Sequence, residues 1–150
     1  IVQCVSLFDI VWNHAYLSTK YDYHRPTLVH KERAYLSMKE LRHILIEQIQ
    51  RDELYVPNDV CLDEERGILL YGTNAVGKSS LIRSIGISVI LAQSGMFVPC
   101  HMEFSPFSRL FTRILGNDNL FRGLSTFRVE SNELIRILQP LVYHLFQRKN

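Results

Sequence analysis

The residues best suited to chemistry form one glycine-rich loop near the middle of the chain, with the pattern G-x-x-x-x-G-K-S. Its members are Gly72, Thr73, Asn74, Ala75, Val76, Gly77, Lys78 and Ser79. In such a loop, backbone N–H groups surround phosphate oxygens, and the positive end of the following helix adds to the attraction. The Lys78 ammonium would contact the β- and γ-phosphates and the Ser79 hydroxyl would ligate Mg²⁺, with Ser80 in the same site. The pattern therefore predicts a site for a nucleoside triphosphate and Mg²⁺.

The sequence on both sides of the loop supplies the elements that the motif needs. The apolar run at residues 68–71 predicts a strand leading into the loop, and the spacing beyond it predicts a helix over residues 78–93. Gly72 and Gly77 allow backbone angles that a Cβ would block, and Gly95 suits the left-handed residue that ends a helix. A strand, a phosphate loop and a helix in this order favour an α/β fold.

Other segments read as helices, strands or turns. Helical spacing predicts a helix over residues 1–21, and a last helix is expected from Ser125-Thr126 to about Leu138, before Pro140. Around Pro99 the chain reads as an edge or turn, because proline has no N–H to donate. Three short apolar or alternating segments predict strands, at residues 27–29, 60–62 and 108–114.

Length and composition limit the class of protein. The 150 residues suffice for about one domain, 47% of them are hydrophobic, and the net charge of +2 is too small to indicate nucleic-acid binding by itself. The cysteines, Cys4, Cys61 and Cys100, are odd in number and scattered, which favours an intracellular reducing compartment over a disulfide framework; mitochondrial or viral origin is left open. Polar residues interrupt the apolar run 85–92 well short of a membrane span, so a buried helix is expected there.

The acidic residue that hydrolysing phosphate-loop proteins need is missing. Such proteins hold Mg²⁺ with an Asp at the end of an apolar strand. The acids that follow Lys78 are Glu103, Asp118, Glu130 and Glu133, and none follows four apolar residues. We therefore expect no catalytic residue in this chain, and neither the scattered cysteines nor the histidines predict another metal site.

Several motifs carry a resemblance to a known family. From Tyr71 to Leu138 the chain resembles the ATPase domain of the MutS family of DNA mismatch-recognition proteins. The matching runs are GTNAVGKS (72–79), LAQSGMFVP (91–99), FTRILG (111–116) and GLSTFRVE (123–130), followed by Glu133; upstream, LRH (41–43) and YVPND (55–59) resemble the start of the same domain. The TNAV loop variant and the run LGNDN look most like the branch found in giant viruses and octocoral mitochondria.

The resemblance implies a fold and a division of the chain. It implies a phosphate-loop NTPase domain of the ABC-ATPase type, with a mostly parallel sheet flanked by helices. Residues 1–22 are similar to the end of the family's lever helix and its junction, and residues 23–138 to an incomplete ATPase domain. Residues 139–150 diverge, because the family's strand ending in Asp-Glu is replaced there by a tail ending in Gln-Arg-Lys-Asn.

The resemblance also implies roles for further residues. Asn74 matches a loop asparagine that can hydrogen-bond phosphates, and Tyr55 matches an aromatic ring that stacks on adenine; its alternative role is that of a half-buried hinge residue. Ser125 and Thr126 match a segment that faces the ATP of the partner subunit, with a plain helix cap as the alternative. Arg42-His43 is expected to organise the N-terminal strands rather than to perform chemistry.

By this resemblance the chain is expected to be the ATP-binding part of a mismatch-recognition protein. ATP and Mg²⁺ binding and hydrolysis would switch a DNA clamp, with mismatched DNA bound by other domains, a dimer formed through the ATPase domain, and no membrane partner. Without its acidic strand this chain is expected to bind ATP weakly or not at all and not to hydrolyse it. Two alternatives stay open: a stand-alone ATP-binding enzyme of small-kinase type, and a non-enzymatic remnant that acts through dimerisation.

Overall fold

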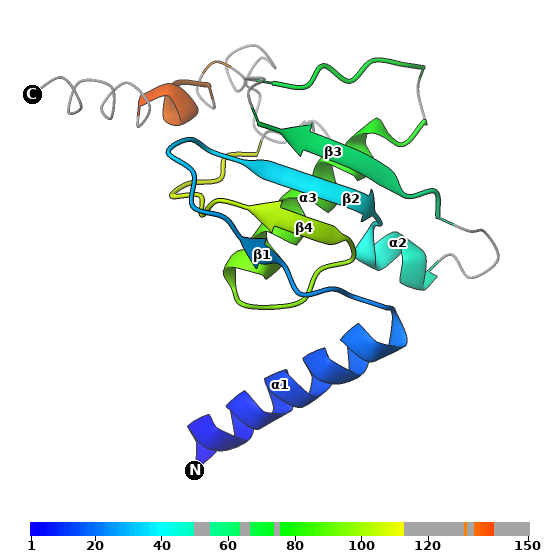
Figure 1. Cartoon of the computed structure of the whole chain (residues 1–150), viewed down its shortest axis with the longest axis vertical. Helices are drawn as coiled ribbons and strands as arrows, with labels where there is room; N and C mark the ends of the chain where they lie inside the picture. The colour runs from blue at the N-terminus through cyan, green and yellow to red at the C-terminus, as the bar shows by residue number, and fades with distance from the viewer. Residues whose placement is uncertain (50–54, 64–66, 74–75, 113–130, 132–133, 140–150) are drawn as a thin grey trace, which may run out of the picture. The chain divides into compact units, whose positions relative to one another are not determined.

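A computed structural model describes residues 1–49, 55–63, 67–73, 76–112, 131 and 134–139. By contact the chain divides into two units, Ile1–Ser108 and Arg109–Asn150, and each is described by itself. The first unit holds every labelled helix and strand discussed below (Figure 1). In the second unit, residues 109–112 have no regular secondary structure, and residues 131 and 134–139 are helical. The expected domain boundaries at residues 22 and 138 stay predictions.

The chain begins with a helix whose apolar side chains face solvent. This helix, α1 (Val2–Lys20), confirms the helical spacing of the first residues, and Lys20 in its last turn suits the negative end of the helix dipole. Phe8 and Trp12 are 69% and 65% exposed, although both are large and apolar. Asp22 follows the helix with a positive φ of 53°, which redirects the chain toward the sheet.

The sheet of the first unit has four strands in the order β1-β4-β2-β3. They are β1 (Thr27–Leu28), β2 (Leu36–Leu41), β3 (Asn58–Leu62) and β4 (His101–Phe104). The β1–β4 pair is parallel, whereas β2 runs antiparallel to both β3 and β4. The expectation of a mostly parallel sheet is therefore wrong for the described strands, and the sheet is mixed. The pairing of β2 with both β3 and β4 gives the centre of the sheet its antiparallel ladders (Figure 1).

An irregularity in β2 decides which of its side chains reach the core. Strict alternation after Leu36 and Met38 would point Glu40 inward. Instead the register shifts between Met38 and Leu41, and Glu40 has a positive φ of 56°. The Glu40 N–H donates to Asp59 Oδ1 over 2.8 Å. This bulge leaves the carboxylate exposed and buries Leu41 completely, as bulges in antiparallel pairs re-aim side chains.

One long helix covers the sheet and completes the core. The helix α3 (Lys78–Gln93) has the bounds expected from the sequence, and Gly95 follows it with φ 78°, as predicted. Its buried face carries small residues and one valine: Ser84, Ser88, Val89 and Ala92. The buried hydrophobic cluster joins this face to the inner residues of β2, β3 and β4 and to the turn before β4; its members include Leu36, Met38, Leu41, Val60, Val98, Cys100, Met102 and Phe104.

Two predicted strands do not form in the described residues. Residues 68–71 run into the phosphate loop without strand structure, and Leu69 and Tyr71 are 86% and 89% exposed. A central parallel strand needs neighbours on its edges and cover on both faces, and no described strand pairs with this segment. Residues 108–112 also lack strand structure, because alternation without a pairing partner does not make a ladder. Residues 113–114 lie outside the described part.

Three elements that form, β2, β4 and α2, have no counterpart among the predicted strands and helices. β4 begins two residues after Pro99, and its alternating pattern His-Met-Glu-Phe buries Met102 and Phe104. The helix α2 (Ile44–Ile49) is only six residues long, too short for a periodic signal. The strands expected near residues 27–29 and 60–62 are confirmed as β1 and β3. Within the described ranges, no helix combines the length and apolar character needed to cross a membrane.

The core assignment predicts a large difference between two phenylalanines. Phe104 is 2% exposed and Phe8 is 69% exposed. We expect Phe104→Ala to lower the free energy of unfolding by about 3–5 kcal/mol, since it leaves a cavity in the core. The matched change Phe8→Ala should alter it by about 0.5 kcal/mol or less. Urea unfolding followed by circular dichroism measures both, and equal losses would contradict the core described here.

The three cysteines, all free thiols, should differ in reactivity. Cys4 and Cys61 are exposed, whereas Cys100 is buried and its burial raises the pKa of its thiol to about 12. A thiol reagent at neutral pH should therefore modify Cys4 and Cys61 in the folded chain, and Cys100 only after unfolding in urea. Because the folded pKa lies above the ordinary value of 9.0, this thiol should disfavour the folded state increasingly as pH rises from about 9 to 12. Fast labelling of Cys100 without denaturant would contradict its burial.

Candidate functional site

The phosphate loop joins α3 through a glycine with a left-handed backbone. Gly77 is the N-cap of α3 and has φ 88° and ψ 7°. In the described part, no side-chain oxygen caps this helix end and its first turn carries no acid. The N–H groups and the positive dipole end of the first turn therefore meet no competing carboxylate from the helix itself. This is the electrostatic arrangement that an anion needs at a helix start.

Lys78 is bonded to its own loop. Its Nζ donates to the carbonyl oxygen of Gly72 over 2.7 Å and also to that of Thr73. Gly72 has φ 151°, and a Cβ there would lie 3.2 Å from Cγ2 of Val76. The loop thus closes around the ammonium group, with a glycine at the point where another side chain would crowd it. A phosphate group would have to replace these two carbonyl oxygens as the partner of Lys78.

A cavity of about 690 Å³ adjoins this loop. Gly77, Lys78 and Ser80 line it on the loop side, and Tyr55 lines it from a distant part of the sequence. Tyr55 is half-buried and belongs to the segment before β3. A cavity that combines a phosphate-binding loop with an aromatic ring can hold a charged group at one end and a flat base at the other.

Part of the apolar wall of this cavity comes from α2, a helix that was not predicted from the sequence. Ile46 and Ile49 of α2 line it, as does Tyr71. His43 starts α2, because its Nδ1 accepts from the N–H groups of Leu45 and Ile46 at 3.3 Å. Burial lowers the pKa of His43, and the positive charge of Arg83 lowers it further, which keeps this nitrogen free to accept. A Ser, Asp or Asn would have marked the helix start; a capping histidine gives a weaker signal.

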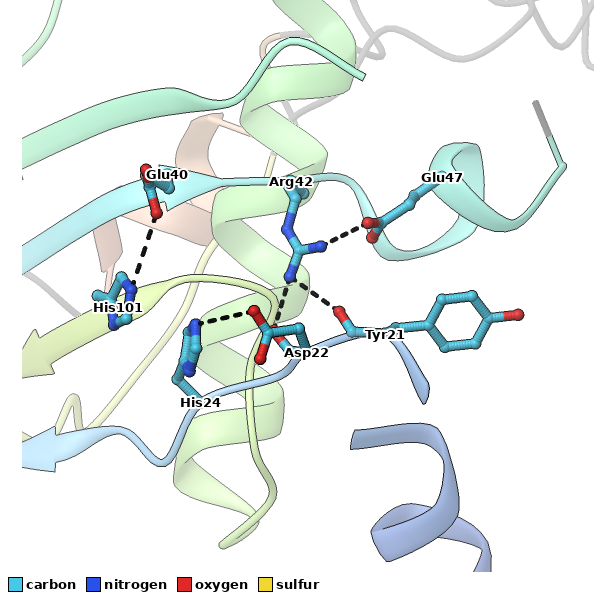
Figure 2. A network of polar contacts seen from close by, with 7 residues as sticks. All are labelled: Tyr21, Asp22, His24, Glu40, Arg42, Glu47 and His101. Atoms are coloured by element: carbon cyan, nitrogen blue, oxygen red, sulfur yellow. Dashed lines mark hydrogen bonds and ion pairs between the residues drawn. The ribbon is translucent and has the colours of Figure 1, made fainter. Parts of the chain in front are cut away.

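A polar network ties α2 to the end of α1 (Figure 2). Arg42, just after β2, donates from Nη1 to Glu47 Oε1 at 2.5 Å and from Nη2 to the carbonyl oxygens of Tyr21 and Asp22 at 3.0 and 2.8 Å. Its own N–H donates to the Pro99 carbonyl over 3.1 Å. Arg42-His43 was expected to organise the N-terminal strands; the bonds of Arg42 instead join α2, the residues after α1 and the turn before β4.

Beside this network two histidines stack on each other. The rings of His24 and His101 lie 3.9 Å apart, centroid to centroid, and each approaches a carboxylate, of Asp22 and Glu40 respectively (Figure 2). The shorter of these approaches is 3.7 Å, longer than a hydrogen bond. Within the described ranges, no group of His, Cys, Asp and Glu side chains has the arrangement of a metal site.

A second cavity of about 690 Å³ differs in its chemistry. It lies between α1 and the turn after α3, with Ile10, Val11 and Phe97 among its lining residues. Among the described residues that line it, none is Lys or Arg. A triphosphate needs positive charge, so the cavity beside Lys78 is the candidate nucleotide site.

The other predicted site residues stand as follows. Thr73, Val76 and Ser79 are exposed on the loop and the first turn of α3. Asn74, Ala75, Ser125 and Thr126 lie outside the described residues. The loop and Tyr55 are thus brought together, and the partner-facing segment at residues 125–126 stays a prediction.

Comparison with known proteins identifies the family. The family model for MutS domain V matches residues 68–143, which include the loop, α3 and β4. The chain belongs to the MutS family. The matched residues extend five positions beyond Leu138, where the sequence resemblance was expected to stop.

Relatives of this MutS-family chain occur in organelles, viruses and bacteria. It is 37% identical to a mitochondrial DNA mismatch repair protein mutS homolog of Sarcophyton glaucum, over 96% of this chain. It is 33% identical to a putative DNA mismatch repair protein mutS homolog of Acanthamoeba polyphaga mimivirus, over 92% of this chain, and 39% identical to DNA mismatch repair protein MutS of Staphylococcus saprophyticus, over 95%. The chain spans 15% to 16% of the length of these relatives. Both sources that the loop variant suggested are represented.

Two glycines, one at the start of α3 and one in its middle, should respond to alanine substitution in opposite directions. Gly77→Ala places a Cβ on a residue with φ 88°, and we expect it to lower the free energy of unfolding by about 1–2 kcal/mol. Gly86→Ala in the middle of α3 meets no atom within 4 Å and should raise it by about 0.5–1 kcal/mol. Urea unfolding of both variants measures the difference. Stabilisation by Gly77→Ala would mean that the loop does not have this conformation.

Proposed function

We propose that this chain is the ATP-binding part of a MutS-like DNA mismatch repair protein. The observation that carries the proposal is that one cavity is lined by both Lys78 and Tyr55, which are not neighbours in the sequence. The first supplies positive charge for phosphates and the second an aromatic face for a base. The names of the relatives, which are DNA mismatch repair proteins, support the wider role.

The phosphates would bind at the start of α3. Lys78 would exchange the carbonyl oxygens of Gly72 and Thr73 for oxygens of the β- and γ-phosphates. The N–H groups of the first turn would donate to the same phosphates. Ser79 is exposed in this turn, and its hydroxyl is an oxygen donor of the kind Mg²⁺ takes together with phosphate oxygens and water. Bound Mg²⁺ would offset part of the phosphate charge.

The base would lie against the apolar wall. Tyr55 offers a face for stacking, and Ile46 and Ile49 from α2 contact the same space. Stacking of a base on an aromatic side chain contributes about 1–3 kcal/mol to binding. Such a site would favour a nucleoside triphosphate over inorganic triphosphate.

The longer protein would use this site to control DNA binding. In this proposal ATP binding and hydrolysis switch a clamp on mismatched DNA that is bound by other domains, and two copies meet through their ATPase domains. Ser125 and Thr126 would face the partner's nucleotide. The expectation that this chain alone does not hydrolyse ATP stays a prediction, which phosphate release measured with the binding assay below will test.

Nucleotide binding can be tested with a fluorescent ATP analogue and Mg²⁺. We expect weak but saturable binding that Lys78→Ala weakens further, at least about tenfold, since a charge-assisted contact worth about 1.4 kcal/mol is lost. Tyr55→Ala should weaken it by about tenfold or more and should leave the affinity for inorganic triphosphate unchanged. The matched control is Lys39→Ala, because Lys39 is exposed on β2 and does not line the cavity.

The same assay separates the proposal from its alternatives. Binding that survives Lys78→Ala, or no binding to the unsubstituted chain, would contradict the proposed site and favour a role in dimerisation. Transfer of phosphate to a small acceptor, abolished by Lys78→Ala and independent of DNA, would favour a kinase-like enzyme. Loss of binding in the Lys39→Ala control would show that the assay reports general instability.

A further inference from the structure

One backbone N–H in the turn after α3 donates to a histidine side chain. Of the N–H groups of residues 94–98, four donate to backbone carbonyl oxygens. Phe97 is the exception, because its N–H donates to Nε2 of His14 over 2.7 Å. His14 belongs to α1, 83 positions earlier in the sequence. The two rings also meet edge to face, with centroids 5.8 Å apart and planes at 88°. The same pair of residues therefore joins α1 to this turn by two kinds of contact.

Few other described contacts hold the helix α1 itself. The other side-chain hydrogen bonds described for it join residues four positions apart within the helix. Its largest apolar side chains, Phe8 and Trp12, are mostly exposed and add little packing. The Arg42 guanidinium holds the two residues that follow the helix rather than the helix. The bond between Phe97 and His14 thus links α1 to a distant segment at a point where little apolar packing assists it.

The bond can exist only while the His14 ring is neutral. A backbone N–H can only donate, so Nε2 must offer a lone pair and the ring proton must lie on Nδ1. A second proton, on Nε2, would turn this nitrogen into a donor that faces another donor. Histidine is the type of side chain whose charge ordinarily changes between about pH 5 and 8. Acid therefore breaks a contact of this kind, whereas a backbone carbonyl oxygen in the same place would keep accepting.

The groups around His14 leave its ring as the source of this charge change. His14 and Phe97 both line the second cavity, and the other titratable residues among its described lining are Asp22 and Tyr23, from the linker after α1. The turn after α3 contributes no titratable side chain to this lining. Burial raises the pKa of the Tyr23 hydroxyl, which therefore stays uncharged in this range, and the Asp22 side chain is 87% exposed. On α1, the Ser18 hydroxyl lies 3.5 Å from Nε2 and donates to the His14 carbonyl oxygen.

From this geometry we propose that His14 and Phe97 form an acid-sensitive clasp between α1 and the turn after α3. While the ring is neutral, it accepts the Phe97 N–H and the clasp is closed. Once the ring is protonated it releases this N–H, and the bonds from Arg42 then hold the linker after α1 rather than the helix. Because one proton opens the clasp, its open fraction rises by up to about tenfold for each pH unit of acidification. The clasp works without nucleotide and goes beyond the proposed function.

The clasp can be followed at the amide that forms it. Hydrogen exchange of the folded chain is measured by NMR from about pH 8 to about pH 5 and corrected for the intrinsic exchange rate. We expect the protection of the Phe97 amide to fall with pH, by up to about tenfold per pH unit. Met96 is the internal reference, since its N–H donates to the carbonyl oxygen of Leu91 over 2.9 Å. Its protection should stay constant, because no side chain takes part in that bond.

Two variants at the same position separate the bond from the titration. In His14→Gln the side-chain amide oxygen accepts the Phe97 N–H at any of these pH values, so protection should remain and its pH dependence should disappear. His14→Leu keeps an apolar side chain without an acceptor, so the Phe97 amide should exchange freely at both ends of the range. The matched control is His30→Gln, because His30 is exposed between β1 and β2, and this variant should behave like the unsubstituted chain.

Each outcome decides for or against the clasp. Constant protection of the Phe97 amide over the whole range, or none at any pH, would overturn it. A pH dependence that persists in His14→Gln would also overturn it, because another group would then be the cause. A dependence lost in His14→Gln and kept in His30→Gln would support it, even if His14→Leu failed to fold. No nucleotide is present in these measurements, so the clasp and the proposed function can fail separately.

Discussion

The structure depends on β2 being paired on both edges. Its ladders with β3 and β4 hold the centre of the sheet. The bulge at Glu40 determines which side chains at the end of the strand face the core. Leu41 enters the core because of the bulge, and Arg42 next to it emerges at the junction with α1 and α2. Without the shift in register, Leu41 would face away from the core. One backbone irregularity thus links hydrophobic packing to the polar network.

The phosphate-loop motif supplies only part of the lining of the candidate cavity. The glycines and Lys78 set the phosphate end by local backbone geometry, which neighbouring residues determine. The base end is assembled from α2 and the segment before β3, and their approach depends on the sheet. A histidine cap and an arginine bridge hold the short α2 in place. The phosphate-loop motif therefore says little about the shape of the cavity beside it.

The sequence predicted features that depend on near neighbours. The bounds of α3, the left-handed Gly95 and the helix α1 follow from periodicity and backbone preference, and all three are confirmed. The motifs also led to the correct family. The mostly parallel sheet, which the family resemblance implied, is wrong for the described strands. No local pattern could correct it, because pairing across the sheet is a long-range property. Residues 68–71 are apolar enough for a strand, yet a strand also needs a partner, and the described residues supply none.

In the candidate site too, the features set by near neighbours were predictable from the sequence and those set by contacts across the fold were not. Tyr55 could be linked to the loop only through the family resemblance, since nothing in its local sequence indicates where it lies. Ile46, Ile49 and Arg42 acquire their roles from contacts across the fold. The helix α2 gave too short a pattern to be detected.

The carbonyl oxygens of Gly72 and Thr73 compete with a bound phosphate for the ammonium group of Lys78. A phosphate can use the ammonium only in the fraction of molecules in which these bonds have opened. The apparent dissociation constant equals the intrinsic constant divided by that fraction, so a loop open one time in ten would bind about tenfold more weakly. Two loops with identical contacts to the bound phosphates could therefore differ in affinity through the free state alone. Substitutions that change how firmly the free loop holds Lys78 would then alter nucleotide affinity, even if they leave every contact to ATP unchanged.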